Sequence, residues 1–324
     1  MAPKNIIITG AGGLVGPLIA ARLLNSPDYH VTLTDLLDPV IPKDVKYPEN
    51  ATCLKGDITS PAFIKTLISS AQPLHAIYIF HGIMSAGSEA NFDLSLSVNV
   101  QSVQTLLLHL RDNTNPKVRV IYSSSQAVYG QPLPAIVTDD VTPTPEGTYG
   151  AHKLLTEIFI NDMHRKGYID AFILRFPSVV VRPGRPTNAA SSFLSGMIRE
   201  PMNGEECVIP LRDRGFRSFM CTPSTLQENL YRVLHMDSEK LPRHVRHVNV
   251  PGVSVSIQEL MDALKKYGGE DKLKFLKEET NEELERILRS WSPDFDVSTP
   301  LRLGFVKDES GEDIVREYVE SLKK

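Results

Sequence analysis

Residues 5–16 read NIIITGAGGLVG, and this stretch decides the fold. The apolar run at 5–9 is typical of a parallel strand that is buried on both faces. Its glycines permit a tight turn, and the apolar periodicity of the next residues, PLIAARLL, predicts a helix. Strand, glycine turn and helix in this order predict a pyrophosphate site, because the helix N-terminus offers free N–H groups to an anion. The predicted contacts are Gly10, Gly13, Leu14, Val15 and Gly16. The alternative is an ordinary glycine-rich loop.

Asp35 ends the second predicted strand, residues 30–35, about twenty residues beyond the glycines. A carboxylate at this place can accept hydrogen bonds from an adenosine ribose and repel a 2′-phosphate. Leu36 and Leu37 follow, and no arginine is present to bind that phosphate. The pattern therefore predicts NAD, rather than NADP, as the cofactor. Taken alone, Asp35 could equally be a solvated carboxylate at a strand end.

Other polar residues follow the ends of predicted strands, where an open parallel sheet binds its ligands. Asp57 and Ile58 suit the edge and face of an adenine, although Asp57 could also be a helix N-cap. Ser85 lies in the exit loop of the fourth strand, where it either faces a substrate hydroxyl or caps the loop. Asn99 lies in a helix predicted over 93–110, as a buried structural amide or as part of a proton relay.

Tyr149 and Lys153 are four residues apart, so on a helix they share one face. A lysine ammonium beside a phenol lowers a pKa that is ordinarily about 10, and the phenol can then exchange a proton with an alcohol or a carbonyl. One chance Tyr-x-x-x-Lys in such a chain is roughly an even bet, so the pair gains weight only from its neighbours. The fifth predicted strand ends upstream in Ser123, Ser124 and Ser125, where a serine can bond a reacting hydroxyl.

Composition excludes several classes of protein. The 324 residues suit one large α/β unit or two domains, and a net charge of −4 predicts no nucleic-acid partner and no acidic membrane surface. Three widely spaced cysteines predict a reducing compartment and no metal site. The N-terminus leaves no room for a signal peptide, and no apolar run approaches the ~18 residues of a membrane span. We therefore expect a cytoplasmic protein.

These motifs, taken together, resemble those of the extended short-chain dehydrogenase/reductases, the NAD-dependent epimerase/dehydratase family. The resembling segments run in family order: GAGGLVG at 10–16, Asp35, Gly56-Asp57-Ile58, Asn99, SSSQAVYG at 123–130 and YGAHK at 149–153. The resemblance implies an α/β fold, with a Rossmann-type doubly wound parallel sheet and a smaller, discontinuous C-terminal substrate domain. It implies an NAD-binding domain of 1–176 plus about 218–249, and a substrate domain of about 177–217 plus 250–324.

The resemblance also implies roles for individual residues. Tyr149 would be the general base for oxidation, and Lys153 would hold the nicotinamide ribose and lower the tyrosine pKa. Ser125 would orient the substrate hydroxyl, with Ser124 as the second choice, and Asn99 would support the site. Ser123 is expected to contact the cofactor.

The same resemblance shows where this chain departs from the family pattern, and it implies an oligomeric state. Where the family usually reads His-Leu-Ala-Ala, residues 79–82 read Ile-Phe-His-Gly, which is expected to place the His81 imidazole near the nicotinamide. The family precedent is a homodimer packed through helices at about 93–110 and 149–165.

Segments across most of the chain are similar to the D-erythronate dehydrogenases within this family. The similar segments are ILRFPSVVVRPGRP at 173–186 with the residues that follow it, EANFDLSLSVNV at 89–100 and WSPDFDVSTPLRLGF at 291–305. This likeness implies NAD-dependent oxidation of the hydroxyl next to the carboxylate of a small sugar acid, a D-erythronate-like 2-hydroxy acid, to the 2-oxo acid.

A carboxylate substrate favours a bidentate guanidinium. Arg182 is the first candidate and Arg185 the second, although either could be a solvated surface arginine. Asn188 and Ser191 are further candidates for substrate contact, and Ser191 could instead only cap the next helix.

Two other functions stay open at this point. A nucleotide-sugar 4-epimerase or dehydratase would use the same Tyr149 but recycle NAD, so it would retain its cofactor and release no NADH. An NAD-sensing regulatory protein on an inactive enzyme scaffold is the third hypothesis. Such proteins often lack the tyrosine or the lysine, and both are present here.

Overall fold

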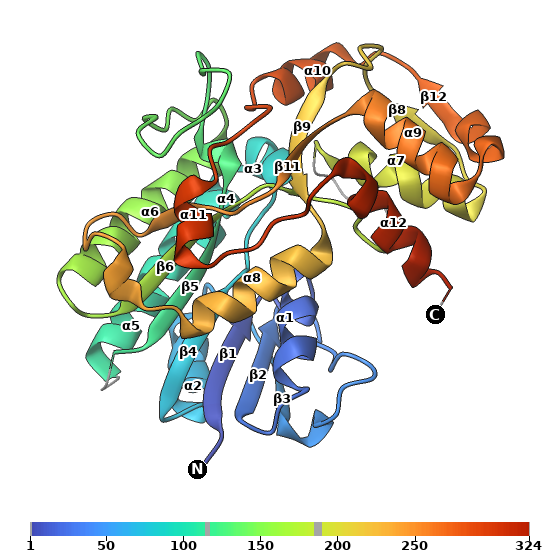
Figure 1. Cartoon of the computed structure of the whole chain (residues 1–324). Helices are drawn as coiled ribbons and strands as arrows, with labels where there is room; N and C mark the ends of the chain where they lie inside the picture. Colours follow the sequence, from blue (N-terminus) through green and yellow to red (C-terminus); the bar gives the residue numbers. More distant parts are fainter. Residues whose placement is uncertain (1, 114–116, 185–189, 324) are drawn as a thin grey trace.

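A seven-stranded parallel sheet forms the centre of the molecule (Figure 1). The computed structural model describes residues 2–113, 117–184 and 190–323. The strand order is β10-β6-β5-β4-β1-β2-β3, which is the doubly wound arrangement expected from the sequence. The strands are β1 (Lys4–Thr9), β2 (Tyr29–Asp35), β3 (Ala51–Lys55), β4 (Leu74–Ile79), β5 (Arg119–Ser125), β6 (Asp170–Phe176) and β10 (His247–Asn249). The predicted fold class is confirmed.

Helices cover both faces of this sheet, which explains the unbroken apolar run of β1. Ile6 and Ile8 point into the core beneath α1 (Val15–Leu23) and α8 (Pro223–His235). Ile7, on the opposite face, joins the core beneath α2 (Pro61–Ser70), α5 (Ser102–Asn113) and α6 (Thr148–Arg165). Because side chains alternate along a strand, a strand that is buried on both faces needs an apolar residue at every position.

A smaller lobe, with a core of its own, lies beside the carboxyl ends of the large sheet (Figure 1). Its three-stranded sheet has the order β11-β9-β7 and its two-stranded sheet pairs β12 with β8. The strands are β7 (Ser178–Val179), β8 (Cys207–Ile209), β9 (Arg217–Cys221), β11 (Val253–Ser256) and β12 (Leu276–Glu278). The helices that complete this half of the chain are α7 (Ser192–Asn203), α9 (Ile257–Gly268), α10 (Glu282–Arg289), α11 (Ser298–Leu303) and α12 (Gly311–Ser321). Short 3-10 helices are η1 (Pro48–Asn50), η3 (Gln126–Val128), η4 (Ser238–Lys240) and η5 (Glu270–Phe275).

The chain passes several times between the large sheet and the smaller lobe. After β6 it enters the smaller lobe, and from β9 it returns through α8, which packs against α1. It then adds β10 to the edge of the large sheet before β11 begins. The exact division into domains stays a prediction.

The helix predicted over 93–110 is present as one helical run over 92–113, but this run contains a π-helical turn. α3 (Ser85–Ala90) and α4 (Phe92–Leu96) precede a π-helical turn, η2 (Ser97–Gln101), and only then does α5 begin. A π turn inserts one residue into a helix and is frequent at functional sites. Here it contains Asn99, one of the predicted site residues.

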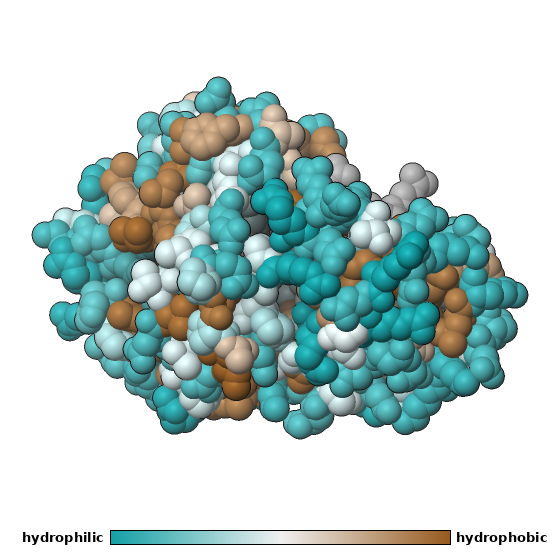
Figure 2. Space-filling model, turned by 90° about the horizontal axis from the view of Figure 1, so that it is seen from above, coloured by the Kyte–Doolittle hydropathy of each residue, from teal (hydrophilic) through white to brown (hydrophobic). Residues whose placement is uncertain are grey.

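The surface in Figure 2 mixes hydrophilic and apolar side chains and shows no continuous apolar band. Within the described residues, no helix combines the length and the apolar character that crossing a bilayer requires.

Candidate active site

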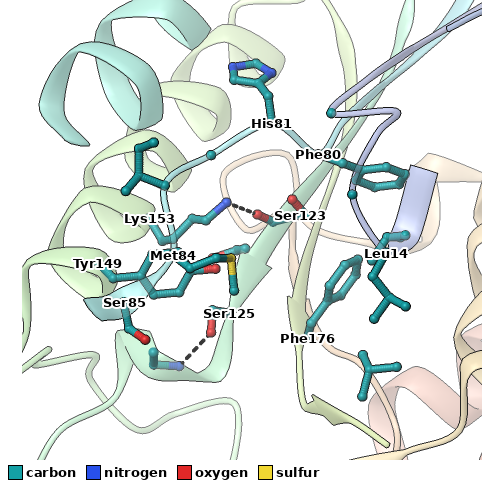
Figure 3. A pocket seen from close by; sticks show the side chains of 18 of the residues that line it. Leu14, Phe80, His81, Met84, Ser85, Ser123, Ser125, Tyr149, Lys153 and Phe176 are labelled. Atoms are coloured by element: carbon teal, nitrogen blue, oxygen red, sulfur yellow. Dashed lines mark hydrogen bonds between the residues drawn. The ribbon is translucent and has the colours of Figure 1, made fainter. Parts of the chain in front are cut away.

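A cavity of about 640 Å³ lies at the carboxyl ends of the central strands (Figure 3). This volume falls in the range of about 300–1,000 Å³ that small-molecule sites occupy. The predicted site residues that line it are Gly10, Gly13, Leu14, Val15, Asp35, Asp57, Ile58, Ser85, Ser123, Ser125, Tyr149, Lys153, Arg182 and Ser191. Gly16 and Asn99 lie behind this lining, and Arg185 and Asn188 lie outside the described residues.

The glycine turn leaves the start of α1 open toward the cavity. Gly10 has a φ of +70°, and a Cβ there would come within 2.5 Å of the His81 backbone nitrogen, so only glycine fits. Leu14, the N-cap of α1, makes no side-chain capping bond. Pro17 is the third residue of the helix, where its missing N–H removes no helical hydrogen bond. The unpaired N–H groups of this helix start therefore fit a pyrophosphate.

The two carboxylates of the cavity follow β2 and β3. Asp35 Oδ2 accepts a hydrogen bond from the Gly12 N–H at 2.9 Å and ties the glycine turn to β2. Asp57 Oδ1 accepts from the backbone N–H and the hydroxyl of Thr59. The N-cap of α2 is Ser60, so the alternative of Asp57 as that cap is wrong.

Only one of the three serines that end β5 has its hydroxyl beside the tyrosine. Ser123 donates its hydroxyl to Ile79 O at 3.0 Å, and Ser124 donates to the buried carboxylate of Glu157. Ser125 Oγ accepts from the Ala127 N–H at 3.1 Å and stabilises a phenolate at Tyr149. The choice of Ser125 over Ser124 thus agrees with the hydrogen bonding.

Lys153 and Tyr149 share a face of α6, but the expected lowering of the tyrosine pKa is wrong for the protein by itself. Burial raises the pKa of Tyr149 to about 12, although Arg182 and the Ser125 hydroxyl act in the opposite direction. Burial likewise lowers the pKa of Lys153 to about 7, against the influence of Glu157. The Lys153 ammonium donates to Ser123 O at 2.5 Å and lies 5.6 Å from the centroid of the Tyr149 ring. It is therefore directed at a carbonyl, and burial of the phenol dominates.

Arg182 is held through its backbone and its side chain. Its N–H donates to Ser195 Oγ at 3.0 Å, and its carbonyl accepts from Arg199 Nη1 at 2.8 Å. Its Nε donates to Val179 O at 3.1 Å. Tyr149 and Arg182 also influence each other's pKa, so the guanidinium lies close enough to act on the phenol.

The negatively and the positively charged side chains of the lining lie in different parts of the cavity. Its carboxylates, Asp35 and Asp57, end the strands of one edge, whereas Lys153 and Arg182 lie with Tyr149. Among the described lining residues no further side chain is a carboxylate. The part of the cavity around Tyr149 is therefore suited to an anion.

Comparison with known proteins decides the family. The model of the NAD dependent epimerase/dehydratase family matches residues 6–221. The chain belongs to this family. The resemblance to the extended short-chain dehydrogenase/reductases is therefore confirmed, and NAD is the cofactor that the family uses.

This epimerase/dehydratase-family chain has full-length relatives. It is 34% identical over 317 residues to the D-erythronate dehydrogenase of Haemophilus influenzae, covering 98% of this chain and 99% of the relative. It is 31% identical to the D-erythronate dehydrogenase of Cupriavidus necator, with 98% of both chains covered. Among solved structures, a nucleoside-diphosphate-sugar epimerase from Agrobacterium tumefaciens superposes with a TM-score of 0.91 at 30% identity, over 98% of this chain and 94% of that one. L-threonine 3-dehydrogenase from Trypanosoma brucei shares the fold, with a TM-score of 0.86 at 21% identity, over 98% of this chain and 96% of that one.

Asn99 supports the site of this family member from behind. Its Oδ1 accepts from the Ile83 N–H at 2.7 Å, and its Nδ2 donates to Ile83 O and to Ser95 Oγ. A Cβ on Gly82 would lie 3.0 Å from Asn99 Oδ1 and 3.8 Å from Lys153 Nζ, so the amide and the ammonium both lie close to this glycine. Of the two roles considered for Asn99, the contacts match the buried structural amide.

His81 is a lining residue of the cavity, and its expected position near the nicotinamide stays a prediction. Its imidazole is turned away from Tyr149 and Lys153 (Figure 3). His81 Nδ1 lies 2.7 Å from Thr9 Oγ1, and Nε2 lies 2.9 Å from Ser102 Oγ. Because the Ser102 hydroxyl donates to Val98 O, it accepts from Nε2, and Nδ1 accepts from Thr9. The imidazole thus links the ends of β1 and β4 to the π turn.

Two other predicted substrate residues begin helices. Ser85 is the first residue of α3 rather than part of an extended loop. Ser191 is the N-cap residue of α7 but makes no side-chain capping bond, and it lines the cavity.

Sequence reasoning missed the contribution of the C-terminal half to the lining. Trp291, Ser292 and Phe295 lie along the cavity, although they follow Tyr149 by more than a hundred residues. The segment that contains them was similar to the D-erythronate dehydrogenases, but no local pattern indicated a site.

Proposed function

We propose that this protein is an NAD-dependent dehydrogenase that oxidises the hydroxyl next to the carboxylate of a small sugar acid, a D-erythronate-like 2-hydroxy acid, to the 2-oxo acid. Two full-length relatives named D-erythronate dehydrogenase support the substrate class. The observation that carries the proposal is the cavity itself, in which Tyr149 and Ser125 share a lining with Arg182 and the carboxylates of the described lining are only Asp35 and Asp57.

The residues around the cavity fit the cofactor. In this proposal the start of α1 binds the pyrophosphate, Asp35 the adenosine ribose and Asp57 with Ile58 the adenine. Lys153 and the Ser123 carbonyl lie where the nicotinamide ribose would be held. NAD, when bound, accepts the hydride.

The protein's own part of the reaction is to orient the acid and to take a proton. Arg182 binds the substrate carboxylate with its guanidinium. Ser125 orients the hydroxyl, and the hydroxyl proton passes to the Tyr149 phenol oxygen as the C–H bond next to the carboxylate breaks. Arg182 and Ser125 both stabilise the phenolate that must first form, so the same two groups serve binding and proton transfer.

A nucleotide-sugar 4-epimerase or dehydratase is the second candidate. The close superposition on a nucleoside-diphosphate-sugar epimerase favours it. The two full-length relatives named D-erythronate dehydrogenase favour the first proposal over it. A small acid also needs less room beside the dinucleotide than a second nucleotide does.

The substitution Arg182→Ala tests the proposed acid site. We expect KM for sugar acids to rise by about tenfold or more, because an uncompensated carboxylate loses its charge-assisted bonds. KM for uncharged polyol analogues should change little. Equal losses on acids and on uncharged analogues would exclude Arg182 as the carboxylate anchor.

We also propose a homodimer formed through α5 and α6. Leu155 and Ile158 on α6 are 50% and 59% exposed, and Leu108 on α5 is 37% exposed. Sedimentation equilibrium should give twice the chain mass of 36.0 kDa, and Leu155→Glu with Ile158→Glu should give the monomer. A monomeric wild-type protein would contradict this assembly.

We place the protein in the cytoplasm, because its three cysteines are free and two of them are buried. Cell fractionation with an antibody would test this location, and recovery outside the cytoplasmic fraction would overturn it.

A further inference from the structure

One wall of the cavity comes from the short segment between α10 and α11. Trp291, Ser292 and Phe295 all line the cavity that Tyr149 and Arg182 share. In Figure 1 this segment descends from α10 toward α11 and passes the loop that follows β5. A C-terminal segment thus contributes to a site whose other parts include the carboxyl ends of the central strands and α6.

Backbone pairing fixes this segment in place. The Val137 N–H donates to Asp294 O at 3.1 Å, and the Asp296 N–H donates to Val137 O at 2.9 Å. The Gln131 side chain reaches Arg289 O at 3.3 Å. The segment is therefore attached to the loop that follows η3, the same loop that leads into the helix of Tyr149.

Aromatic packing anchors the segment from beneath. Phe295 is 4% exposed, and its ring lies 5.6 Å from Tyr129 and 5.1 Å from Phe219, measured between centroids. Tyr129 follows η3, and Phe219 lies on β9, so Phe295 joins both parts of the molecule. Aromatic pairs at these distances attract each other beyond their buried area.

Trp291 is held by its own surroundings as well. Its backbone N–H donates to Leu288 O at 3.2 Å, and its side chain is half-buried against the core of the smaller lobe. Ser292 fixes the next turn by donating its hydroxyl to Asp294 O at 2.8 Å. The indole packs against this core and also lines the cavity, so it forms part of the cavity wall.

We propose that Trp291 limits the length of the substrate, so that the site accepts short acids and excludes longer sugar acids and nucleotide sugars. This inference rests on the function proposed above and assigns its size selectivity to one residue. In this proposal the carboxylate binds at Arg182, the reacting hydroxyl lies at Tyr149, and the far end of a longer chain meets the indole. Discrimination against one added methylene in a closed pocket is about 10–200-fold.

Two matched substitutions test the wall. We expect Trp291→Ala to raise kcat/KM for a six-carbon aldonate, relative to a four-carbon one, by about tenfold or more. Trp291→Phe keeps most of the ring volume and should keep most of the preference. Melting curves by circular dichroism control for folding of both variants. An unchanged ratio in a folded Trp291→Ala protein would overturn the proposal.

The chain contains one tryptophan, so its fluorescence reports on this wall without turnover. In a Tyr149→Phe protein loaded with NAD, a four-carbon aldonate should change the emission in a saturable way, and a six-carbon aldonate should not. Equal responses to both acids, or to neither, would contradict the assignment.

The two proposals fail in different ways. If the wild type oxidises a four-carbon acid but the Trp291→Ala ratio is unchanged, the wall alone is wrong. If the wild type oxidises no acid while its emission still responds only to the short one, the dehydrogenase is wrong and the wall stands. If both readouts are silent, both are wrong.

Discussion

Tyr149, the proposed general base, has surroundings that oppose a negative charge on its phenol oxygen. Burial raises its pKa to about 12, even though Arg182 and the Ser125 hydroxyl act against burial. A substrate carboxylate bound at Arg182 would neutralise the positive charge of the guanidinium. The Ser125 hydroxyl, which also orients the reacting hydroxyl, would then be more important. The tyrosine, the serine and the arginine therefore form one functional unit.

The substitution Tyr149→Phe removes the proton acceptor and leaves the ring in place. We expect kcat to fall by about a hundredfold or more, because the general base contributes about 10²–10⁴-fold. NAD affinity, measured by calorimetry, should stay within a factor of a few. Near-normal turnover would show that another group takes the proton.

The lowered pKa of His81 makes the unfolding free energy depend on pH. Burial, and to a smaller degree Lys153, lowers its pKa from 6.5 to about 3. Between these values the unfolded chain binds a proton that the folded chain does not. The stabilising effect of a neutral His81 is therefore complete above pH 6.5 and is lost progressively as the pH falls toward 3.

The substitution His81→Gln keeps a donor for Ser102 and an acceptor for Thr9 but does not titrate. From pH 7.5 to pH 5.0 the unfolding free energy of the wild type should fall by about 2 kcal/mol more than that of the variant, at about 1.4 kcal/mol per pH unit below 6.5. Urea unfolding at the two pH values measures this difference. Parallel losses in both proteins would mean that His81 is not the acid-sensitive group.

At the scale of elements, the path of the helices was only partly predictable. The start of α6 follows from Tyr149 and Lys153, and β1 with α1 follows from the apolar run and the glycines. The π turn at Asn99 was not predictable, because one inserted residue hardly changes an apolar pattern. The helix α3 was missed for a related reason, since it is short and has one buried residue, Ser88.

Gly150 shows how closely two of these elements approach each other. A Cβ at this position would lie 2.0 Å from Ala127 O, so the start of α6 and η3 are in contact through the glycine. Gly150→Ala should therefore displace Tyr149 from Ser125. We expect the variant to lose about 1–3 kcal/mol of stability and at least tenfold in kcat.

The matched control is Gly215→Ala, an exposed position where the added methyl would meet only the Asp213 side chain, at 3.2 Å. Melting temperature and kcat of this variant should remain near those of the wild type. A Gly150→Ala protein with equally normal values would show that the close contact has no role in placing the tyrosine.

At the scale of the whole molecule, the nucleotide half was far more predictable than the substrate half. The predicted strands and the glycine turn depend on local patterns, and all of these lie in the large sheet or at its edge. The wall of the cavity depends instead on Val137 pairing with the backbone around Phe295, across more than 150 residues. Periodicity reports which face of an element is buried, but not which distant segment covers it. For the same reason Trp291 was missed.

The overall architecture suits a two-substrate reaction in one cavity. The cofactor-binding half brings the helix start of α1 and the carboxylates of β2 and β3, and the other half brings Arg182 and the wall around Trp291. In the proposed function, positive charge near Tyr149 selects an acid and the wall around Trp291 selects a short one.

The most direct test is NADH absorbance with the purified protein, NAD and a panel of hydroxy acids, with NADP as the control cofactor. The panel contains D-erythronate, the threonate stereoisomers, uronates and threonine. We predict NAD-dependent turnover that is fastest with a four-carbon aldonate. Silence across the panel, with NAD still bound after purification, would contradict the dehydrogenase and favour an epimerase-like reaction on a nucleotide sugar.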